Sequence, residues 1–348
     1  MISSFIRDFI IAVAFLIVGV IASPVFQDWW DENIGITPVR LSNLLQDNNI
    51  HEFNNLRKQF HEKVEFDGID LSSRDLRGAN LDSIILRNVN LSKTNLESAV
   101  LDNSQISGDL SNITLRYASL LDAILTGVTL NDADLTGSEL QDADLTNANM
   151  YGADLTNASM WDADLTDADM YDAELRGANL EDANLDGAIL ANANLTGAMV
   201  LDADLRGTVL HYADLRDANF WDADLTDAEL ARADLRDAIF WDAVLTDADL
   251  DSADLTNADF YGADLTDAGL RRANLTNAGL QNTDLTEANL MWANLTNADL
   301  TVAILSESIF NCDSLKTANL NVNSTQFHVV EDMDIGSIVE VSDCDDGS

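Results

Sequence analysis

Large apolar residues recur at every fifth position over most of this chain. These centres begin at Phe66 and Leu71, slip by one residue between Ile106 and Leu110, and then continue every fifth residue to Leu320. Neither the 3.6-residue period of a helix nor the two-residue alternation of a strand explains a repeat of five. A chain that repeatedly makes a short extended side and then bends does explain it. The pattern therefore predicts an all-β solenoid.

The residues between the centres follow a regular pattern as well. A small residue stands two positions before most centres, as Ala133 does before Leu135. Residues two apart in an extended segment point the same way, so Ala and Leu are predicted to face inward and the Asp or Asn between them outward. The other two positions are polar or glycine, as in Thr146 and Asn147, which suits a corner.

The repeated runs ADLTN, ANLTG, ADLRD and ANLTN resemble the A-(D/N)-L-x-x signature of pentapeptide-repeat proteins over roughly three quarters of the chain. The resemblance implies a right-handed quadrilateral β-helix with four pentads per coil. About 13 such coils, stacked at ~4.8 Å, would make a rod roughly 60 Å long. Thr follows the centre in alternate pentads, as at Thr246, Thr256 and Thr266, so opposite sides of a four-sided coil would match.

Residues 1–27 are predicted to be a membrane anchor or signal segment. The apolar run from Phe9 to Phe26 is about the minimum length that spans a bilayer as one transmembrane helix, and Trp29 and Trp30 follow where interfacial anchors sit. A cleaved signal peptide is the alternative, but the length of the run and the single cation before it favour a retained anchor. Arg7 and the acidic C-terminal flank predict a single-pass membrane protein with the repeats outside the cytosol.

The repeat is absent from residues 28–63, where we predict a linker and a helical N-terminal cap. Thr37 and Pro38 indicate one helix start, since proline suits the first turn. Asn49 can cap a second helix, with Glu52 three residues later and Phe53 on its apolar face. This face would cover the open first coil, because the terminal units of a solenoid need capping.

The remaining boundaries follow from where the period holds. Residues 64–322 form the predicted β-helix, and residues 323–348 an acidic C-terminal tail or cap. Whether the segment from Phe327 to Val341 closes the last coil as a strand is left open.

Charge restricts the function. Across 348 residues, 61 acidic and 18 basic side chains give a formal net charge of -43. A sequence-independent nucleic-acid binder needs cations to neutralise phosphates, so nucleic acid is excluded as a partner. The acidic excess is spread along the whole chain, which is typical of proteins from extreme halophiles.

The chain lacks the elements of a catalytic or metal site. Its four histidines are scattered, no nucleophile has an adjacent base, and the predicted interior is filled by Leu and Ala. Cys312 and Cys344 form no C-x-x-C pair, and either a disulfide or two unrelated thiols fits them. We therefore predict no enzyme activity, no cofactor and no metal.

A period of 20 residues would align large apolar residues in one outer column. We call this column the aromatic stripe, comprising Trp161, Leu201, Trp221, Trp241 and Tyr261. Phe220, Phe240 and Phe260 would stack inside it, and the facing column, with His211 and Arg271, is less apolar. The stripe could dock a protein partner or a second copy of the rod. Alternatively, its rings could stack and simply stabilise the coils, which is the interpretation we favour.

An acidic column follows immediately after the stripe. This acidic ladder comprises Asp122, Asp142, Asp162, Asp182, Asp202, Asp222 and Asp242. Neighbours ~4.8 Å apart repel by about 0.9 kcal/mol in water, and molar salt removes most of that repulsion. A cation-binding ladder is one interpretation, and we favour a solvated face of a salt-adapted protein.

The sequence therefore predicts a non-enzymatic, membrane-anchored scaffold that presents an acidic rod to an unknown protein partner at the cell envelope. The alternative is a DNA mimic that regulates a type II topoisomerase, as some members of the resembled family do. The net charge along residues 131–300 is roughly one per 1.4 Å, close to that of duplex DNA. The chain lacks the loop insertions and C-terminal dimerisation helix of the gyrase-protecting members.

Overall fold

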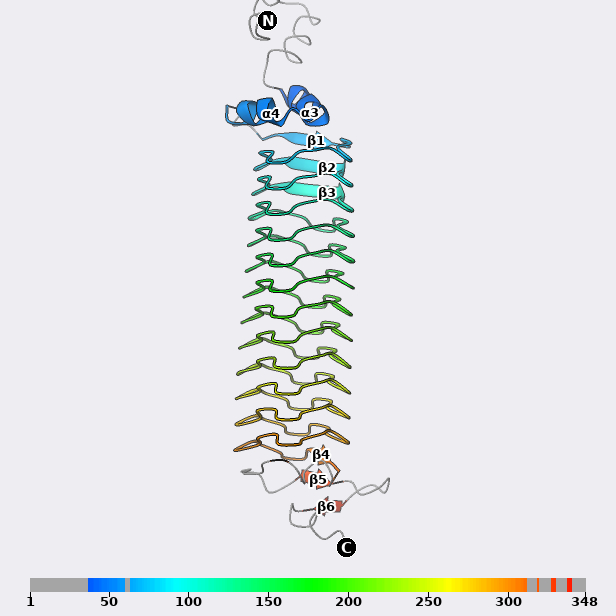
Figure 1. Ribbon diagram of the computed structural model, residues 1–348, viewed down its shortest axis with the longest axis vertical. Coiled ribbons are helices and arrows are strands. Elements are labelled where there is room, and N and C mark those ends of the chain that lie inside the picture. Colours follow the sequence, from blue (N-terminus) through cyan, green and yellow to red (C-terminus); the bar gives the residue numbers. More distant parts are fainter. Residues whose placement is uncertain (1–36, 60–62, 312–317, 319–326, 330–336, 340–348) are drawn as a thin grey trace, which may run out of the picture.

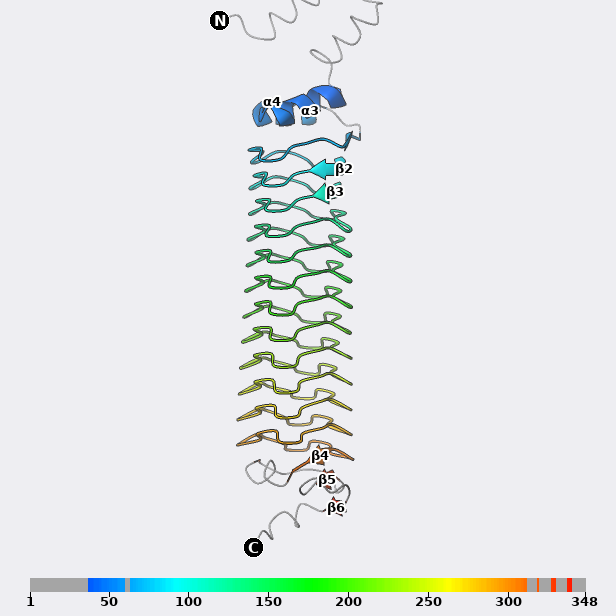
Figure 2. The ribbon, with the colours of Figure 1, turned by 90° about the vertical axis from the view of Figure 1, so that its right-hand side faces the viewer.

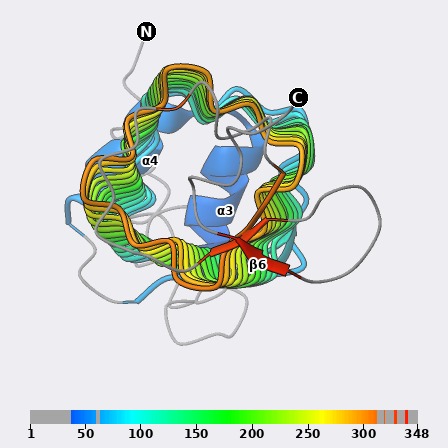
Figure 3. The same ribbon diagram turned by 90° about the horizontal axis from the view of Figure 1, so that it is seen from below.

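The protein is a straight four-sided rod closed at one end by two helices. Its computed structural model describes residues 37–59, 63–311, 318, 327–329 and 337–339. Two views at right angles show a rod of similar width in both directions (Figures 1 and 2), and the view along its axis shows the four sides of the stacked coils (Figure 3).

The two helices begin at the predicted residues. Helix α3 spans Pro38–Gln46, with proline in its first turn and the Thr37 side chain accepting the N–H of Arg40. Helix α4 spans Ile50–Arg57, and the side chain of its N-cap, Asn49, accepts the N–H of Glu52. Both predicted helix starts are confirmed.

Apolar packing and hydrogen bonds join this cap to the first coils. Phe53 is fully buried and belongs to the same continuous core as the coil interior. The Asn54 amide donates to the carbonyl of Gly78 at 2.8 Å and accepts the N–H of Asn80 at 2.8 Å. Arg57 donates to the carbonyl of Asp82 at 2.6 Å. The cap therefore satisfies backbone groups that the open end of the rod would otherwise leave unpaired.

Parallel pairing between coils has the predicted 20-residue period. Bridges run from Asp70 with Asn90 to Asn289 with Ile309 and join residues 20 apart, except for three near the one-residue slip that join residues 19 apart, such as Asn95 with Thr114. Strands β1 (Glu65–Asp67), β2 (Ile85–Asn90) and β3 (Gln105–Asp109) form a parallel sheet along one side. At the usual ~4.8 Å between paired strands, residues 65 to 309 make a rod about 60 Å long.

The one-residue slip between Ile106 and Leu110 is a local irregularity in this sheet. The register shifts between Leu86 and Val89, and the pairing offset drops there from 20 to 19 residues. Gly108 lies opposite Val89 with a φ of 135°, and a Cβ on it would come within 2.1 Å of the Val89 carbonyl oxygen. Only glycine fits this conformation and this close approach.

The rod is filled by the repeating Leu and Ala side chains. Leu145, Leu165 and Leu185 are fully buried, and the alanine before each is at most 1% exposed. Phe220, Phe240 and Phe260 stack inside one side, with ring centroids 4.9 Å and 4.7 Å apart and planes within 3° of parallel. The predicted inward-facing Leu–Ala column and its phenylalanine stack are confirmed.

Most pentads satisfy their backbone N–H groups in the same way. From Asp144 to Ala148, three N–H groups donate to carbonyls of adjacent coils, and Ala148 closes the turn onto the Leu145 carbonyl. The remaining N–H, that of Thr146, donates to Oδ1 of Asp144 at 3.0 Å. The Asp or Asn of the repeat therefore caps the first N–H of the following turn, which explains why an amide or carboxylate recurs there.

At the C-terminal end, two further short strands extend the last coil. Strand β4 (Ile309–Phe310) pairs in parallel with β5 (Phe327–Val329), and β5 pairs antiparallel with β6 (Ser337–Val339). The segment from Phe327 to Val341 thus contributes strands to the end of the rod.

Some expectations concern residues that the structure does not describe. The apolar run from Phe9 to Phe26 lies outside the described residues, as do Cys312 and Cys344. Among the residues that are described, no helix has the length and hydropathy needed to cross a membrane.

Candidate functional site: the corner columns

Each coil has four two-residue corners, and these carry the side chains that a partner can reach. We number them from residue 121, so that residues 121–122, 126–127, 131–132 and 136–137 start the first, second, third and fourth corners. Each corner repeats every 20 residues and makes a column along the rod (Figure 3). The first residue of a corner is usually half-buried and the second is usually exposed. The second has a positive φ at nearly every turn.

The acidic ladder occupies the second residue of the first corner. All seven aspartates are exposed, with φ between 53° and 57°. Asp, Asn and Gly tolerate this left-handed conformation better than other residues. Backbone geometry therefore restricts the residue type in this column to a small set, which the sequence analysis did not foresee.

Electrostatic repulsion within the ladder is evident at Asp222. Local desolvation, followed by the carboxylates of Asp202 and Asp242, raises the pKa of Asp222 above its usual range. Across the described part of the chain, no group of three or more His, Cys, Asp or Glu side chains is arranged to hold a metal ion.

The aromatic stripe occupies the first residue of the same corner. Trp161, Trp221, Trp241 and Tyr261 are 40% to 52% exposed, and Leu201 is half-buried. Trp221 and Trp241 meet edge to face, with centroids 6.1 Å apart and planes at 71°. This arrangement differs from the parallel stack of Phe220, Phe240 and Phe260.

An open hollow lies along the C-terminal half of the stripe. Its volume is about 480 Å³, and its walls are formed by Trp221, Trp241, Tyr261, Gln281 and the side chains of Asp242 and Asp259. Three aromatic side chains, two carboxylates and one amide therefore line it. A mixture of aromatic and polar side chains is typical of a protein-binding surface.

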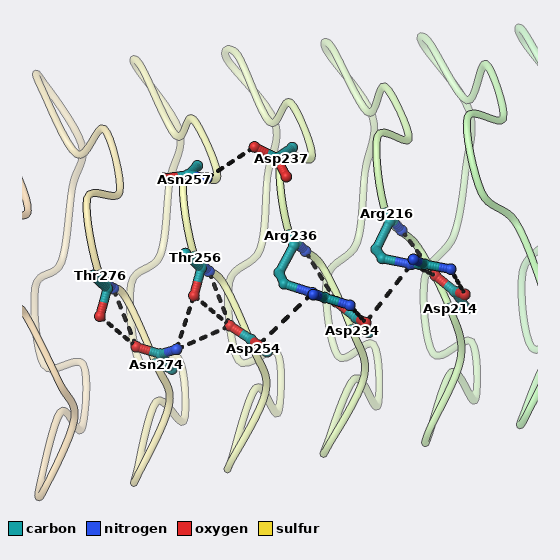
Figure 4. Close-up of polar contacts among 10 residues, drawn as sticks. All are labelled: Asp214, Arg216, Asp234, Arg236, Asp237, Asp254, Thr256, Asn257, Asn274 and Thr276. Atoms are coloured by element: carbon teal, nitrogen blue, oxygen red, sulfur yellow. Dashed lines mark hydrogen bonds and ion pairs between the residues drawn. The ribbon is translucent and has the colours of Figure 1, made fainter.

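The fourth corner is occupied by its own ion pairs (Figure 4). Arg216 donates to both oxygens of Asp214, at 2.7 Å and 2.6 Å, and also lies 3.7 Å from Asp234 in the next coil. Arg236 repeats the arrangement with Asp234. The hydrogen bonds from Arg216 lower the pKa of Asp214. These arginines are therefore already engaged, although exposed pairs of this kind contribute little to stability.

The third corner departs from the usual residue types between residues 211 and 292. The second residues of five successive corners are Tyr212, Arg232, Ser252, Arg272 and Trp292, all with φ between 59° and 64°. A hollow of about 360 Å³ lies along this corner. It is lined by these second residues from Tyr212 to Arg272 and by the first residues of the same four corners, His211, Ala231, Asp251 and Arg271. From the sequence, His211 and Arg271 were expected only to belong to a less apolar column. The missed signal was this run of residues that disfavour a positive φ.

Comparison with known protein families identifies the five-residue repeat. The family model for pentapeptide repeats matches the chain in eight copies over residues 65–107 and 109–311, which leaves out Gly108 at the register shift. No curated protein matches the chain.

Among solved structures, the chain is similar to HetL, a pentapeptide repeat protein involved in heterocyst differentiation regulation from the cyanobacterium Nostoc sp. strain PCC 7120. The two are 36% identical with a TM-score of 0.56, over 57% of this chain and 90% of HetL. A pentapeptide repeat protein from the Arabidopsis thaliana thylakoid lumen is 32% identical over 30% of this chain and 72% of that one, with a TM-score of 0.21. QnrB1, a plasmid-mediated fluoroquinolone resistance protein, is 19% identical over 54% of this chain and 89% of its own, with a TM-score of 0.37.

Proposed function

Because this chain belongs to the pentapeptide-repeat family, with its right-handed β-helix, we propose that it is a non-enzymatic protein-interaction scaffold held at a membrane by residues 9–26. The interior of the rod is packed with Leu and Ala, so only the outer surface is available to a partner. The corners present the largest side chains on that surface. We infer that the aromatic stripe of the first corner is the principal binding surface.

The exposed aromatic hollow is the observation that carries this proposal. Trp221, Trp241 and Tyr261 lie half-exposed around it on an otherwise acidic rod. Aromatic residues are enriched at the buried centres of protein interfaces, where they supply large apolar area and little conformational entropy is lost.

The distribution of charge favours a scaffold over a DNA mimic. Duplex DNA carries phosphates along both strands. On this rod the first corner is strongly acidic, but the fourth corner pairs Arg216 and Arg236 with aspartates, and the third carries Arg232 and Arg272. A topoisomerase that recognises the charge of DNA would therefore meet a matching pattern on only part of the surface.

Replacement of the stripe tests the proposal. The variant Trp221→Ser, Trp241→Ser, Tyr261→Ser should lose a partner that co-purifies and cross-links with the native protein, and Kd measured with the two purified components should rise at least tenfold. Tyr151→Ser with Tyr171→Ser removes exposed rings from the third corner and serves as the control, with binding unchanged. Equal binding by all three proteins would refute the role of the stripe.

A second copy of the rod is the other partner that the stripe could bind. Sedimentation in high salt distinguishes a second copy from a different protein. If the parent is oligomeric and becomes monomeric when the stripe is replaced, the stripe binds a second copy. If the parent is already monomeric, the partner is a different protein.

Membrane placement is tested separately. Protease added to intact cells should remove the repeats if residues 9–26 anchor a rod that lies outside the cytosol. Full protection of the repeats would contradict this orientation and would favour the alternative function, regulation of a topoisomerase.

A further inference from the structure

The third corner carries several residues at positions whose backbone conformation favours other residue types. At the second residue of a corner, most coils place Asp, Asn or Gly, which tolerate the positive φ. Tyr212, Arg232, Arg272 and Trp292 adopt the same conformation in four of five successive coils, with Ser252 in the middle coil. Residues that keep a conformation unfavourable to them point to a role other than folding.

Two of these residues are arginines without an ion pair in a part of the rod where the other arginines have one. Eight arginines lie between Arg116 and Arg272, with no lysine among them. Six of the eight lie within ion-pair distance of Asp or Glu. Among the described residues, Arg232 and Arg272 have no such partner. Unpaired guanidinium groups are unexpected on a chain with a net charge of -43, where carboxylates are abundant.

Aromatic rings hold both arginines from the outer sides. The Arg232 guanidinium lies 5.5 Å from the centre of the Tyr212 ring, one coil before it, and donates to the Tyr212 hydroxyl. The Arg272 guanidinium lies 5.4 Å from the Trp292 ring, one coil after it. Such cation–π contacts orient a guanidinium without neutralising it.

Ser252 lies between the two arginines and leaves the hollow open. Its N–H bonds to the coil of Arg272, and the N–H of Arg232 bonds to the coil of Ser252, so the three residues occupy consecutive coils. Arg232 and Arg272 are thus two coil steps apart, or about 10 Å along the rod. Two N–H···O contacts of about 2.8 Å and one carboxylate group between them span about 8 Å, so the two side chains need to lean toward each other by only about 2 Å to hold it.

The acidic groups beside the hollow are already engaged. Asp251 accepts the N–H of Arg271 at 2.8 Å and lies 4.0 Å from its guanidinium. Glu229 lies 2.7 Å from His211. They therefore compete less for Arg232 and Arg272 than free carboxylates would.

We propose that Arg232 and Arg272 form a clamp for an Asp or Glu carboxylate on an acidic segment of a partner protein. This inference rests on the proposed scaffold function and names the partner chemistry of a second surface, diagonally opposite the aromatic stripe. The guanidinium fork matches the geometry of a carboxylate, and the flanking rings keep the two forks in place. The remainder of the rod repels an acidic segment, so binding is confined to this corner.

A labelled peptide of alternating Glu and Gly provides the probe, and the same peptide with Gln is its uncharged control. Fluorescence polarisation with the full chain in 0.5 M KCl should show binding of the Glu peptide and at least tenfold weaker binding of the Gln peptide. Arg232→Gln with Arg272→Gln should lower affinity for the Glu peptide at least tenfold. Equal binding of the two peptides would overturn the proposal.

The matched control is Arg216→Gln with Arg236→Gln, which removes two arginines from the ion-paired fourth corner at similar heights. Its affinity for the Glu peptide should stay within twofold of the parent, and far-UV circular dichroism should show both double variants folded. Equal losses in the two variants would reduce the effect to net charge and refute the clamp.

Two further measurements identify the anion and separate this proposal from the scaffold function. Acetate should displace the Glu peptide at lower concentration than inorganic phosphate, and anionic lipid vesicles should not bind; the reverse of either result overturns the carboxylate assignment. The stripe variant Trp221→Ser, Trp241→Ser, Tyr261→Ser should bind the Glu peptide normally. If that variant also retains its protein partner, the stripe proposal fails while the clamp stands.

Discussion

Asp144 shows how much one residue of the repeat does. Its N–H donates to the Ala123 carbonyl and its carbonyl accepts the N–H of Leu125, both in the preceding coil, and its side chain caps the N–H of Thr146. The alternation of the sequence predicts that this residue points outward. Its capping role was not predicted, because that role depends on the turn geometry that follows the buried leucine.

Gly108 gives the sharpest prediction at the scale of one residue. Gly108→Ala should lower the free energy of unfolding by at least about 3 kcal/mol, because the new Cβ would meet the Val89 carbonyl and the positive φ would be strained. Gly127 has a φ of 65° but no atom within 4 Å of an added Cβ, so Gly127→Ala should cost only about 1 kcal/mol. Urea unfolding measures both, and equal costs would contradict this account of the register shift.

Replacing Val302 should raise the stability of the protein, because its positive φ is unfavourable for this residue type. It is a β-branched residue at the second position of a corner, with a φ of 63°. Val302→Asn should raise the free energy of unfolding by about 1 kcal/mol, since Asn tolerates this conformation. Val302→Thr keeps the branched Cβ and should leave stability unchanged. A gain from Thr equal to that from Asn would attribute the effect to polarity instead of backbone strain.

At the scale of the coil, the five-residue period predicted the inward Leu–Ala pairs, and the four pentads per coil implied by the family resemblance then predicted the stacking of coils and of the phenylalanines. The two helix starts were also readable, because Thr37, Pro38 and Asn49 are local signals. The clamp of the third corner could not be predicted in the same way. It depends on which residues occupy the second position of each corner and on side-chain contacts between coils. Neither follows from the five-residue period.

The phenylalanine stack provides a prediction at this scale. Phe240 is fully buried between Phe220 and Phe260. Phe240→Ala should cost about 3–5 kcal/mol of unfolding free energy, because a cavity opens in a filled column. Phe240→Leu restores the residue found at most centres and should cost roughly 1–1.5 kcal/mol, as coils elsewhere accommodate Leu. A similar cost for both would mean that the side chain is not tightly packed.

At the scale of the whole molecule, charge and shape are coupled through the stacked coils. Each coil adds another carboxylate to the acidic ladder, about 4.8 Å from the last, so the repulsion grows with the length of the column. The unfolded chain separates these charges. Folding therefore concentrates negative charge, and salt should stabilise the rod by screening it.

Salt dependence tests this coupling. Urea unfolding followed by far-UV circular dichroism should give a higher unfolding free energy in 2 M KCl than in 0.1 M KCl. Asp142→Asn, Asp182→Asn and Asp222→Asn leave no two adjacent carboxylates in the ladder and keep a residue suited to positive φ. This variant should be more stable than the parent in 0.1 M KCl and should respond less to salt.

The control for this variant removes three aspartates that have no aspartate above or below them in their columns, Asp132, Asp167 and Asp172. Their replacement by Asn changes net charge equally and should affect the salt response less. Identical responses in both triple variants would assign the effect to net charge alone and would contradict the ladder argument.

The central claim is that two diagonally opposite corners bind proteins and the other two do not. A photo-cross-linking residue placed in turn at Trp241, Thr246, Asp251 and Thr256 samples the four corners of one coil, and adducts in intact cells report which corners a protein contacts. The account predicts protein adducts at positions 241 and 251 and few at 246 and 256. Equal labelling at all four positions, or labelling confined to 246 and 256, would contradict it.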